Sequence, residues 1–338
     1  MNIKKVAELC NVSVATVSRV INKKGNVKKE TEEKILKVIE ELNYIPNALA
    51  RNLSKQESDV IGVVVPDITN VFYTEVIKGI MESASQNNLH VIFYNTDSDM
   101  EKEINALKMI KEQRLKGALL ISALKKSSKD KKMLKNTLET LDMPLILINK
   151  YIDNLPYDGV FTDDVMAGYL LTESLIENKH KDIAILTGAR NSIVANNRVV
   201  GYKNAFRDYN IEIKNENIIY ADFNSIENSY KIIKEHFENK EIPKGIIAGN
   251  NNITIACVRY FNERKVKINK DVSLVAFDDI EILNWLGMEL TVVSQNPKEM
   301  GKEAFNMLFN RINNKNIPIN RIHVVPELIL RGSEKIIK

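Results

Sequence analysis

The sequence has few of the residues that stabilise exported proteins or anchor membrane proteins. It contains 2 cysteines and 1 tryptophan in 338 residues, so a framework of disulfide bonds is excluded. The longest apolar runs, such as residues 60–65, are far shorter than the ~18 residues that a membrane-spanning helix needs. No apolar stretch follows Lys4 and Lys5 that would serve as a signal peptide. Two free thiols without an export signal predict a cytoplasmic protein.

The sequence also lacks the residue groupings that are typical of enzymes. Its 4 histidines are scattered, without the spacing of metal ligands. No Gly-x-Ser-x-Gly nucleophile elbow, Walker loop or Gly-x-Gly-x-x-Gly turn occurs in it. Cys10 and Cys257 are predicted to be small buried apolar side chains. We therefore expect no catalytic residues, no metal site and no cofactor, and the protein is not predicted to be an enzyme.

Excess positive charge is confined to the start of the chain. The formal net charge is +4, and residues 1–58 hold 11 basic and 7 acidic side chains, whereas the rest of the chain holds 37 of each. This asymmetry is typical of a nucleic-acid-binding head joined to a neutral body. A difference of 4 charges can also arise by chance, so the pattern of residues within the head has to decide.

Apolar residues at helical spacing predict three short helices in the head. Val6, Leu9 and Cys10 form one apolar face, residues 17–21 contain a second, and residues 35–42 contain a third. Two short helices joined by a tight turn and packed against a third helix describe a helix-turn-helix unit. A three-helix bundle that binds nothing has the same periodicity, so the spacing leaves both interpretations open.

The turn and the second helix carry side chains that suit this unit and DNA. Asn11 tolerates the left-handed backbone of a tight turn, and the Ser13 hydroxyl can cap the helix that follows. Small residues at the start of that helix let its backbone approach the floor of a DNA groove. Arg19 can form a fork on a guanine edge, and Thr16 and Ser18 suit phosphate contacts.

The string of residues 2–21, NIKKVAELCNVSVATVSRVI, strongly resembles the DNA-binding head of the lactose-repressor (LacI/GalR) family. The resemblance implies that Val14, Ala15 and Arg19 read the edges of bases. Two positions depart from the family pattern. Asn11 stands where the family usually has Gly, and Lys28 stands where a Ser usually caps the third helix, so that this cap is either weaker or supplied by Asn26.

Residues 46–55 are predicted to form a hinge helix that folds only on DNA. Pro46 presets the start of a helix and good helix formers follow, but the segment is shorter than the ~12–15 residues that an isolated helix needs. The resemblance implies that Leu53 wedges between base pairs in the minor groove and kinks the duplex; the alternative is that Leu53 packs on the body. The predicted DNA-contacting residues are Val14, Ala15, Thr16, Ser18, Arg19, Asn47, Ala48, Leu49, Arg51 and Leu53.

From residue 60 onward, short apolar strands alternate with amphipathic helices. This alternation predicts an α/β body with parallel sheets covered by helices, and the number of strands predicts two lobes. The strands are expected at residues 60–66, 90–95, 117–122, 144–149, 159–162, 183–187, 218–221, 245–248 and 273–277. Ligands of such sheets bind beyond the carboxyl ends of the strands, where this chain has many Asn and Asp residues. These side chains suit a polyhydroxylated or heteroaromatic ligand, although both residues are also common in turns.

The resemblance to the LacI/GalR family covers essentially the whole chain. It implies a two-lobed body similar to periplasmic sugar-binding proteins, with the chain crossing between the lobes near Thr162, Gln295 and His323. The expected domains are a helix-turn-helix head at residues 1–45, a hinge helix and linker at 46–59, and an effector-binding and dimerisation body at 60–338. Lobe one is expected at about 60–161 and 295–322, and lobe two at about 162–294 and 323–338.

The resemblance also implies a set of effector-contacting positions. Arg198 offers a bidentate fork, and Asp278 offers a bidentate acceptor for vicinal hydroxyls. Phe72 and Phe223 either pack against a ring of the ligand or belong to the core. Residues 250–256 depart from the family pattern, since an Asp is missing there and Thr254 is bulkier than the usual residue, which leaves the ligand type open. The predicted effector-binding residues are Phe72, Tyr73, Asn149, Arg198, Phe223, Asn250 and Asp278.

Together these features predict a DNA-binding transcriptional regulator, a repressor that binds a near-palindromic operator as a homodimer. The expected effector is a sugar or a related small metabolite in the cleft between the lobes. The alternative within the family is a catabolite-control regulator whose main effector is a phosphorylated carrier protein. A solute-binding or enzymatic module whose N-terminal helices serve only assembly is disfavoured by the charge distribution, by Arg19 and by the hinge string.

Overall fold

A computed structural model describes residues 3–21, 25–42, 58–123, 128–152 and 155–336, and the chain divides into two compact units, Met1–Ser58 and Asp59–Lys338. The first unit contains the predicted head and the second the predicted body. Most of the predicted hinge lies outside the described residues, and with it the predicted DNA-contacting residues Asn47, Ala48, Leu49, Arg51 and Leu53.

The head consists of α1 (Ile3–Cys10), α2 (Val14–Ile21) and α3 (Lys29–Glu41) around a small apolar core. Asn11 has a φ of +54°, and the Ser13 hydroxyl accepts a hydrogen bond from the Thr16 amide at 3.2 Å, so the predicted turn and cap are confirmed. No side-chain hydrogen bond from Lys28 caps α3. Leu9 was expected on the buried face but is 50% exposed, because the buried face of α1 is formed by Val6, Ala7 and Cys10.

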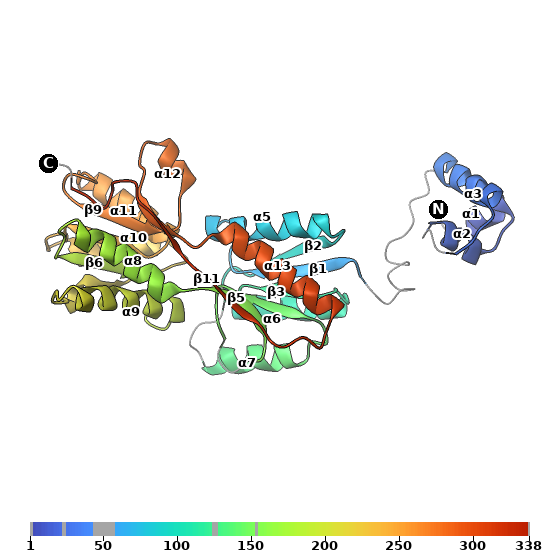
Figure 1. Ribbon diagram of the computed structural model, residues 1–338, viewed down its shortest axis with the longest axis horizontal. Helices are drawn as coiled ribbons and strands as arrows, with labels where there is room; N and C mark the ends of the chain where they lie inside the picture. Colours follow the sequence, from blue (N-terminus) through green and yellow to red (C-terminus); the bar gives the residue numbers. More distant parts are fainter. Residues whose placement is uncertain (1–2, 22–24, 43–57, 124–127, 153–154, 337–338) are drawn as a thin grey trace. The chain divides into compact units, whose positions relative to one another are not determined.

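Lobe one of the body is a six-stranded parallel sheet in the order β11-β5-β4-β3-β1-β2 (Figure 1). Apolar side chains from alternate positions of the central strands point to opposite faces, so both faces need a helical cover. On one face pack α5 (Val71–Gln86) and α13 (Pro297–Asn313), and on the other α6 (Met100–Glu112) and α7 (Ser128–Glu139). The strands are β1 (Val60–Val65), β2 (His90–Asn95), β3 (Ala118–Leu120), β4 (Leu145–Ile148), β5 (Asp158–Thr162) and β11 (Arg321–Val324).

Lobe two repeats this architecture with the order β12-β10-β9-β8-β6-β7, in which only the edge strand β12 is antiparallel to its neighbour. On one face lie α8 (Asp164–Glu177) and α9 (Ile193–Asp208), and on the other α10 (Ile226–Phe237) and α11 (Asn251–Glu263). The short helices η1 (Asn215–Asn217) and α12 (Glu281–Trp285) complete the lobe. The strands are β6 (Ile183–Thr187), β7 (Ile218–Tyr220), β8 (Gly245–Ala248), β9 (Ser273–Phe277), β10 (Thr291–Ser294) and β12 (Glu327–Ile329).

The two-lobed parallel α/β body with an all-α head confirms the predicted fold class, and each of the nine predicted strands is present. The sequence did not predict β10, β11 and β12. These strands have only three or four residues and each includes polar or charged side chains, whereas the equally short β3 and β7 form apolar runs. Their strand conformation is therefore set by pairing with segments far away in the sequence.

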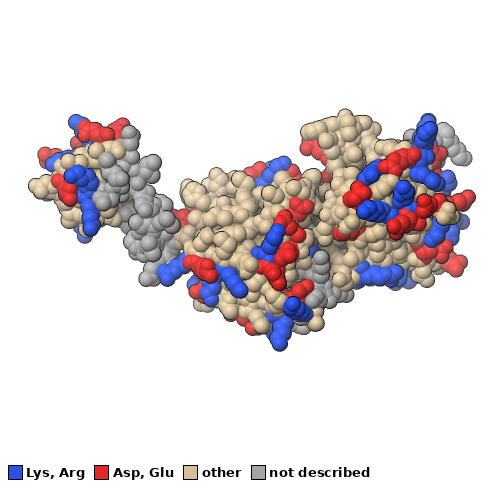
Figure 2. All heavy atoms as spheres, turned by 180° about the vertical axis from the view of Figure 1, so that it is seen from behind, with Lys and Arg blue, Asp and Glu red and all other residues tan. Residues whose placement is uncertain are grey.

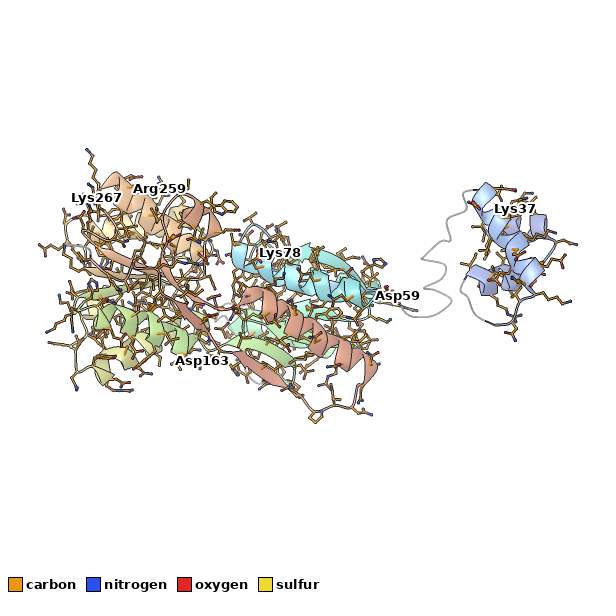
Figure 3. The ribbon with its side chains drawn as sticks, turned by 45° about the horizontal axis from the view of Figure 1, so that its top comes forward. Lys37, Asp59, Lys78, Asp163, Arg259 and Lys267 are labelled. Atoms are coloured by element: carbon orange, nitrogen blue, oxygen red, sulfur yellow. The ribbon has the colours of Figure 1, made fainter. Side chains whose placement is uncertain are left out.

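The chain passes between the lobes three times: after Thr162, through Gln295, and after Val324. Asp163, labelled in Figure 3, lies at the first passage and caps α8 by accepting the Met166 amide at 2.9 Å. Thr162 and His323 belong to strands of lobe one, not to lobe two as the predicted bounds had it. The reason is that β5 and β11 pair with each other over their last residues, Thr162 and Val324.

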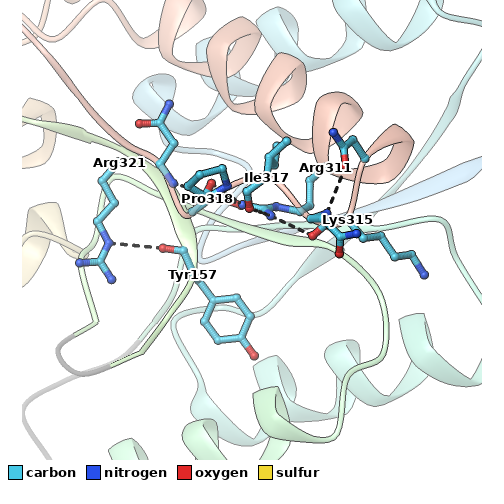
Figure 4. Close-up of polar contacts among 10 residues, drawn as sticks. Tyr157, Arg311, Lys315, Ile317, Pro318 and Arg321 are labelled. Atoms are coloured by element: carbon cyan, nitrogen blue, oxygen red, sulfur yellow. Dashed lines mark hydrogen bonds and ion pairs between the residues drawn. The ribbon is translucent and has the colours of Figure 1, made fainter.

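The segment that joins α13 to β11 is held by one arginine (Figure 4). Arg311 forms a bidentate ion pair with Asp158, at 2.8 and 2.9 Å, and donates to the carbonyl groups of Lys315, Ile317 and Pro318. Arg321 donates to the Tyr157 carbonyl at 3.4 Å. Because Asp158 is the first residue of β5, this network fixes the edge strand β11 and its neighbour β5, which lead to two of the passages.

In lobe two, α8 and α9 approach each other closely enough for their backbones to touch. A Cβ atom on Gly201 would lie 2.0 Å from the Val165 carbonyl oxygen, and one on Gly168 would lie 2.3 Å from the Arg198 carbonyl oxygen. Neither neighbour is a flexible side chain that could move aside. Glycine at both positions therefore sets the distance between α8 and α9, and with it the place of Arg198.

We expect Gly201→Ala to lower the free energy of unfolding of the body by about 1–3 kcal/mol, because overpacking outweighs the better helix propensity of Ala. Lys203→Ala is the matched control, since Lys203 is exposed on the same helix, and should change stability by no more than about 0.5 kcal/mol. Urea unfolding followed by circular dichroism measures both. Equal stabilities of the two variants would show that the helices can separate without cost.

Candidate functional site

A cavity of about 400 Å³ lies between the carboxyl ends of the two sheets. Both lobes line it, because the loops after β1, β4, β6, β7, β8 and β9 all open toward the same space. The structure brings all of the predicted effector-binding residues to its wall, namely Phe72, Tyr73, Asn149, Arg198, Phe223, Asn250 and Asp278. A polar cavity of this size at the carboxyl ends of parallel strands is suited to a small ligand.

Arg198 is held in a fixed position at the lobe-two wall of the cavity. Its Nε donates to the Asp164 carboxylate at 2.9 Å, and its Nη1 donates to the Gly249 carbonyl. The guanidinium carbon lies 3.9 Å from the centre of the Phe277 ring and 5.5 Å from that of Phe223. Burial raises the pKa of Asp164 against the opposing effect of Arg198. The pair is therefore a buried ion pair whose members each depend on the other.

Asp278 is buried beside the second passage between the lobes. Its φ is +63°, and its carboxylate accepts the backbone amide of Gln295 at 3.2 Å and the side-chain amide of the same residue at 2.6 Å. Burial raises the pKa of Asp278 to about 6, against the opposing effect of Arg198. Both carboxylate oxygens are thus engaged by a residue that joins the lobes. A ligand that uses Asp278 has to share it with Gln295 or replace Gln295.

Asn250 mainly positions other parts of the cavity wall. Its Oδ1 caps α11 by accepting the Ile253 amide at 3.0 Å, and its Nδ2 donates to the Phe223 carbonyl at 2.8 Å. Asn252 donates to the same carbonyl at 2.9 Å. The two amides hold the loop that carries the Phe223 ring, so the segment that departs from the family pattern shapes the site.

The aromatic residues of lobe one belong to both the cavity and the core. Phe72 is 8% exposed and packs among the buried residues under α5 and α13, so its predicted core role is confirmed, and it also lines the cavity. Its ring meets that of Tyr73 edge-on at 5.5 Å. Burial, with a smaller contribution from Asp67, raises the pKa of Tyr73 to about 12. The Tyr73 hydroxyl is therefore protonated at neutral pH and can donate a hydrogen bond to a ligand.

Several residues of the wall were not among the predicted contacts. Lys150 and Asn251 directly follow residues that were predicted, so their place after a strand was the available signal. Gln295 follows β10, a strand that the sequence did not reveal. Ser98 donates to Asn224 across the two lobes at 3.4 Å. The remaining unpredicted residues of the wall include Asn70, Asn191, Ser192 and Asp222.

Of the predicted DNA-contacting residues, the structure describes those on α2. Val14, Ala15 and Arg19 are exposed, and Thr16 and Ser18 are half-buried. The Thr16 hydroxyl lies 2.9 Å from that of Ser13, so it also takes part in the cap of α2. Arg19 follows Ala15 by four positions, which places both on one side of the helix.

The comparisons with known proteins decide the family. Residues 2–47 match the model for bacterial regulatory proteins of the lacI family, and residues 58–329 match that for periplasmic binding proteins and the sugar binding domain of the LacI family. The chain belongs to the LacI family. It is a DNA-binding transcriptional regulator and not an enzyme, as the sequence predicted, because the members of this family are regulators.

Named relatives extend over the full chain. The HTH-type transcriptional repressor PurR of Histophilus somni is 30% identical over 337 residues, which cover 98% of each chain. The ribose operon repressor of Haemophilus influenzae is 29% identical over 98% of this chain and 97% of its own. Among solved structures, the lac repressor dimer bound to operator and the anti-inducer ONPF has a TM-score of 0.86 at 22% identity over 99% of each chain. The cellobiose complex of the regulator CelR has a TM-score of 0.71 at 22% identity, over 98% of this chain and 99% of its own.

Two further properties of the LacI-family chain concern only its described residues. Among them, no group of three or more His, Cys, Asp or Glu side chains is arranged to hold a metal ion. None of the helices within the described ranges is long and apolar enough to cross a membrane.

Cys10 and Cys257 are both buried, as predicted, and burial raises the pKa of the Cys257 thiol to about 12. This thiol is therefore protonated and unreactive at neutral pH.

We expect Asp278→Asn to stabilise the body at neutral pH. The folded-state pKa of Asp278 lies above its unfolded value, so the ionised carboxylate destabilises the fold above about pH 6, and this cost disappears as the pH falls toward 4. The stability difference between variant and wild type should grow from near zero at low pH to at most about 3 kcal/mol at pH 7. Asn at this position also adopts positive φ readily, and its Oδ1 can keep the bond from the Gln295 backbone amide. Its Nδ2 can donate to Gln295 Oε1 once the side-chain amide of Gln295 turns and Nε2 leaves its present acceptor.

Asp279→Asn is the matched control, with the opposite sign. The Arg331 guanidinium beside Asp279 holds the pKa of that carboxyl below its usual range. The stabilisation of the folded body by ionised Asp279 is therefore present above the ordinary pKa of Asp, and it is lost as the pH falls through the lowered pKa. The control variant should be less stable than wild type at pH 7. Denaturant unfolding between pH 4 and 8 measures the stability of both variants. A change in stability of the same sign for both at pH 7 would contradict the opposite pKa shifts of Asp278 and Asp279.

Proposed function

We propose that this LacI-family protein is a cytoplasmic transcriptional repressor that binds operator DNA as a homodimer and responds to a small effector in the cavity between its lobes. The observation that carries the proposal is the combination of two sites in one chain. The head exposes Val14, Ala15 and Arg19 on α2, and the body has a cavity of about 400 Å³ with polar side chains in its wall. A DNA-reading helix and a ligand cavity are what an effector-gated regulator needs.

The relatives support a sugar or a related metabolite as the effector. One of the solved relatives is bound to cellobiose and another to the anti-inducer ONPF, and a named relative is the ribose operon repressor. In this chain Arg198 and Asp278 offer a donor fork and a carboxylate acceptor to paired hydroxyls. A cavity of about 400 Å³ lined by these groups fits a small molecule, so the phosphorylated carrier protein is the less favoured effector.

On DNA, each head places α2 in the major groove. Val14, Ala15 and Arg19 contact base edges there, and Thr16 and Ser18 contact phosphates. Asn47, Ala48, Leu49, Arg51 and Leu53 of the hinge add minor-groove contacts, with Leu53 as the wedge. One head reads few base pairs, so two heads on a near-palindromic site supply the affinity and specificity of the dimer.

We expect Arg19→Ala to weaken operator binding by about 1–3 kcal/mol and to relax the preference for one base pair, since Arg19 is assigned to a base edge. Lys37→Ala is the control, because Lys37 is an exposed cation on α3, where its ammonium group lies 3.9 Å from Glu41. It should leave base preference unchanged. Binding to a randomised operator library, measured for both variants, gives the affinity and the preference at each position.

That prediction also tests the proposed function. If wild-type protein showed no preference among duplex sequences at any salt concentration, DNA recognition by α2 would be refuted. If Arg19→Ala and Lys37→Ala lost equal affinity for every sequence, Arg19 would be a phosphate contact and not a base contact.

A largely uncharged surface around α12 supports the homodimer. Ile282, Trp285 and Leu286 are 58%, 74% and 76% exposed, and on α5 Val71 and Met81 are 44% and 48% exposed. Figure 2 shows the protruding end around α12 with few charged side chains. Exposed apolar groups of this size are costly to leave in water, and such patches mark interfaces with proteins. We assign this α12 surface to the partner subunit.

We expect Leu286→Glu to turn the dimer into a monomer and to weaken operator binding with it, because a charge would be buried against the partner. Val200→Glu is the control, since Val200 is a 45% exposed apolar residue on α9, outside the α12 surface. Light scattering after size exclusion gives the mass of each variant. Trp285 is the single tryptophan of the chain, so its fluorescence should shift to shorter wavelength as wild type dimerises. A Leu286→Glu variant that remains dimeric would place the interface elsewhere.

A further inference from the structure

Among the described residues of the cavity wall, the two cations, Arg198 and Lys150, each interact with a buried carboxylate. Arg198 pairs with Asp164 at 2.9 Å and also interacts electrostatically with Asp278. Lys150 interacts electrostatically with Glu103, which is 0% exposed. Arg198 is therefore already paired within the protein, and Glu103 offsets part of the charge of Lys150. Asp222 adds a further carboxylate to the wall.

Glu103 reaches the cavity wall from α6, behind the end of β3. Its carboxylate accepts the Ser122 hydroxyl at 2.7 Å and the backbone amide of Ala123, and Ala123 lines the cavity together with Lys150. Burial raises the pKa of Glu103, and these two hydrogen bonds and Lys150 oppose that effect. Glu103 thus places a carboxylate directly behind the part of the wall where Lys150 stands.

Three helices begin at the cavity, and each start is already capped. Asn70 accepts the Phe72 amide at 3.0 Å on α5, Ser192 accepts the Ala195 amide at 3.3 Å on α9, and Asn250 caps α11. The first turn of a helix is a common binding site for phosphate, because its amide groups are free there. Here side-chain oxygens occupy one of these amides at each start, which reduces the attraction for an anion.

The buried polar atoms that remain without a partner in this region belong to neutral side chains. Both side-chain amide atoms of Asn251, and Oε1 of Gln295, have no hydrogen-bond partner among the described residues, and both residues line the cavity. The two residues are 5% and 2% exposed. Amide groups pair equally well with hydroxyl, N–H and carbonyl groups of an uncharged ligand.

We propose that the effector is an uncharged ring compound that carries adjacent hydroxyl or N–H and carbonyl groups, and that the cavity rejects its phosphorylated counterpart. The inference rests on the proposed function and deepens it by naming the ligand class. Among the described residues, a phosphate group would enter a wall whose two cations already interact with carboxylates, and it would lie near Asp222 and Asp278. Like charges brought together in this way cost several kcal/mol, so the phosphorylated form should bind ~100-fold more weakly or worse.

Matched pairs of ligands test the proposal on the full-length protein. The pairs are ribose and ribose 5-phosphate, glucose and glucose 6-phosphate, cellobiose and cellobiose 6-phosphate, and adenine, guanine or uracil with the corresponding nucleoside monophosphate. Thermal shift identifies binders, calorimetry gives their affinities, and release or tightening of operator DNA shows that a binder is an effector. We expect every binder that changes operator affinity to be uncharged, and the sugar and nucleobase pairs separate the two sources of this chemistry.

A charge variant tests the physical cause. Glu103→Gln keeps both hydrogen bonds, since the amide oxygen can accept from Ala123 while the amide nitrogen donates to Ser122, but it removes the charge behind Lys150. It should bind the phosphorylated ligand about 10-fold more tightly, a gain of about 1.4 kcal/mol, and leave binding of the uncharged ligand nearly unchanged. Glu101→Gln is the control, because it removes the same charge from an exposed position on the same helix.

Each outcome decides between distinct conclusions. A phosphorylated or carboxylated effector that binds more tightly than its uncharged counterpart would overturn the inference and leave effector gating intact. An unchanged affinity ratio in Glu103→Gln would overturn the electrostatic explanation. If no compound of either class changed the melting temperature or operator binding, the proposed effector-gated function itself would fail.

Discussion

The ion pair between Arg198 and Asp164 is the interaction on which the cavity depends. It joins α9, which carries Arg198, to the first residue of α8, Asp164. The two side chains can meet because Gly168 and Gly201 let the two helices touch. A buried charge that loses its partner is strongly destabilising, so neither residue can change alone. The ring of Phe277 beneath the guanidinium and the Gly249 carbonyl beside it connect the pair to the ends of β9 and β8.

Asp278 extends this arrangement from one lobe to the other. It is buried close enough to Arg198 to interact with it, and it accepts both amide groups of Gln295, which lies in the passage back to lobe one. A ligand bound to Asp278 therefore acts on the backbone that joins the lobes. This contact offers a direct physical route by which occupancy of the cavity changes the relation between the lobes.

How much the sequence revealed depended on whether the information was local. The turn at Asn11 and the cap at Ser13 involve neighbours in the chain, and local sequence patterns located the long helices and nine of the strands. Strand ends pointed to the residues of the cavity, because the carboxyl ends of parallel strands meet at one edge. The resemblance to a family then selected seven residues that the structure brings to one wall, though what they bind stays a proposal.

Sequence reasoning missed the residues whose environment is set by distant segments. Glu103 lies in a charged stretch typical of an exposed helix face, and only the packing of α6 against β3 buries it. Gln295 follows a strand of four residues that has no period of its own. Asn250 was predicted to contact the effector, but its amide is largely used for the cap of α11 and for Phe223. Hydrogen bonds between distant segments leave no mark in a single sequence.

The three passages between the lobes have a mechanical consequence. The strands that flank the first and third passages are paired with each other in lobe one, and β10 and β12, which flank the second and third, are paired in lobe two. The three connecting segments are therefore attached at adjacent points on both sheets. Sliding of one lobe past the other would require all three connections to lengthen, so this motion is resisted. Bending about a single axis through the connections needs only small changes of torsion angle, so the body has one soft degree of freedom.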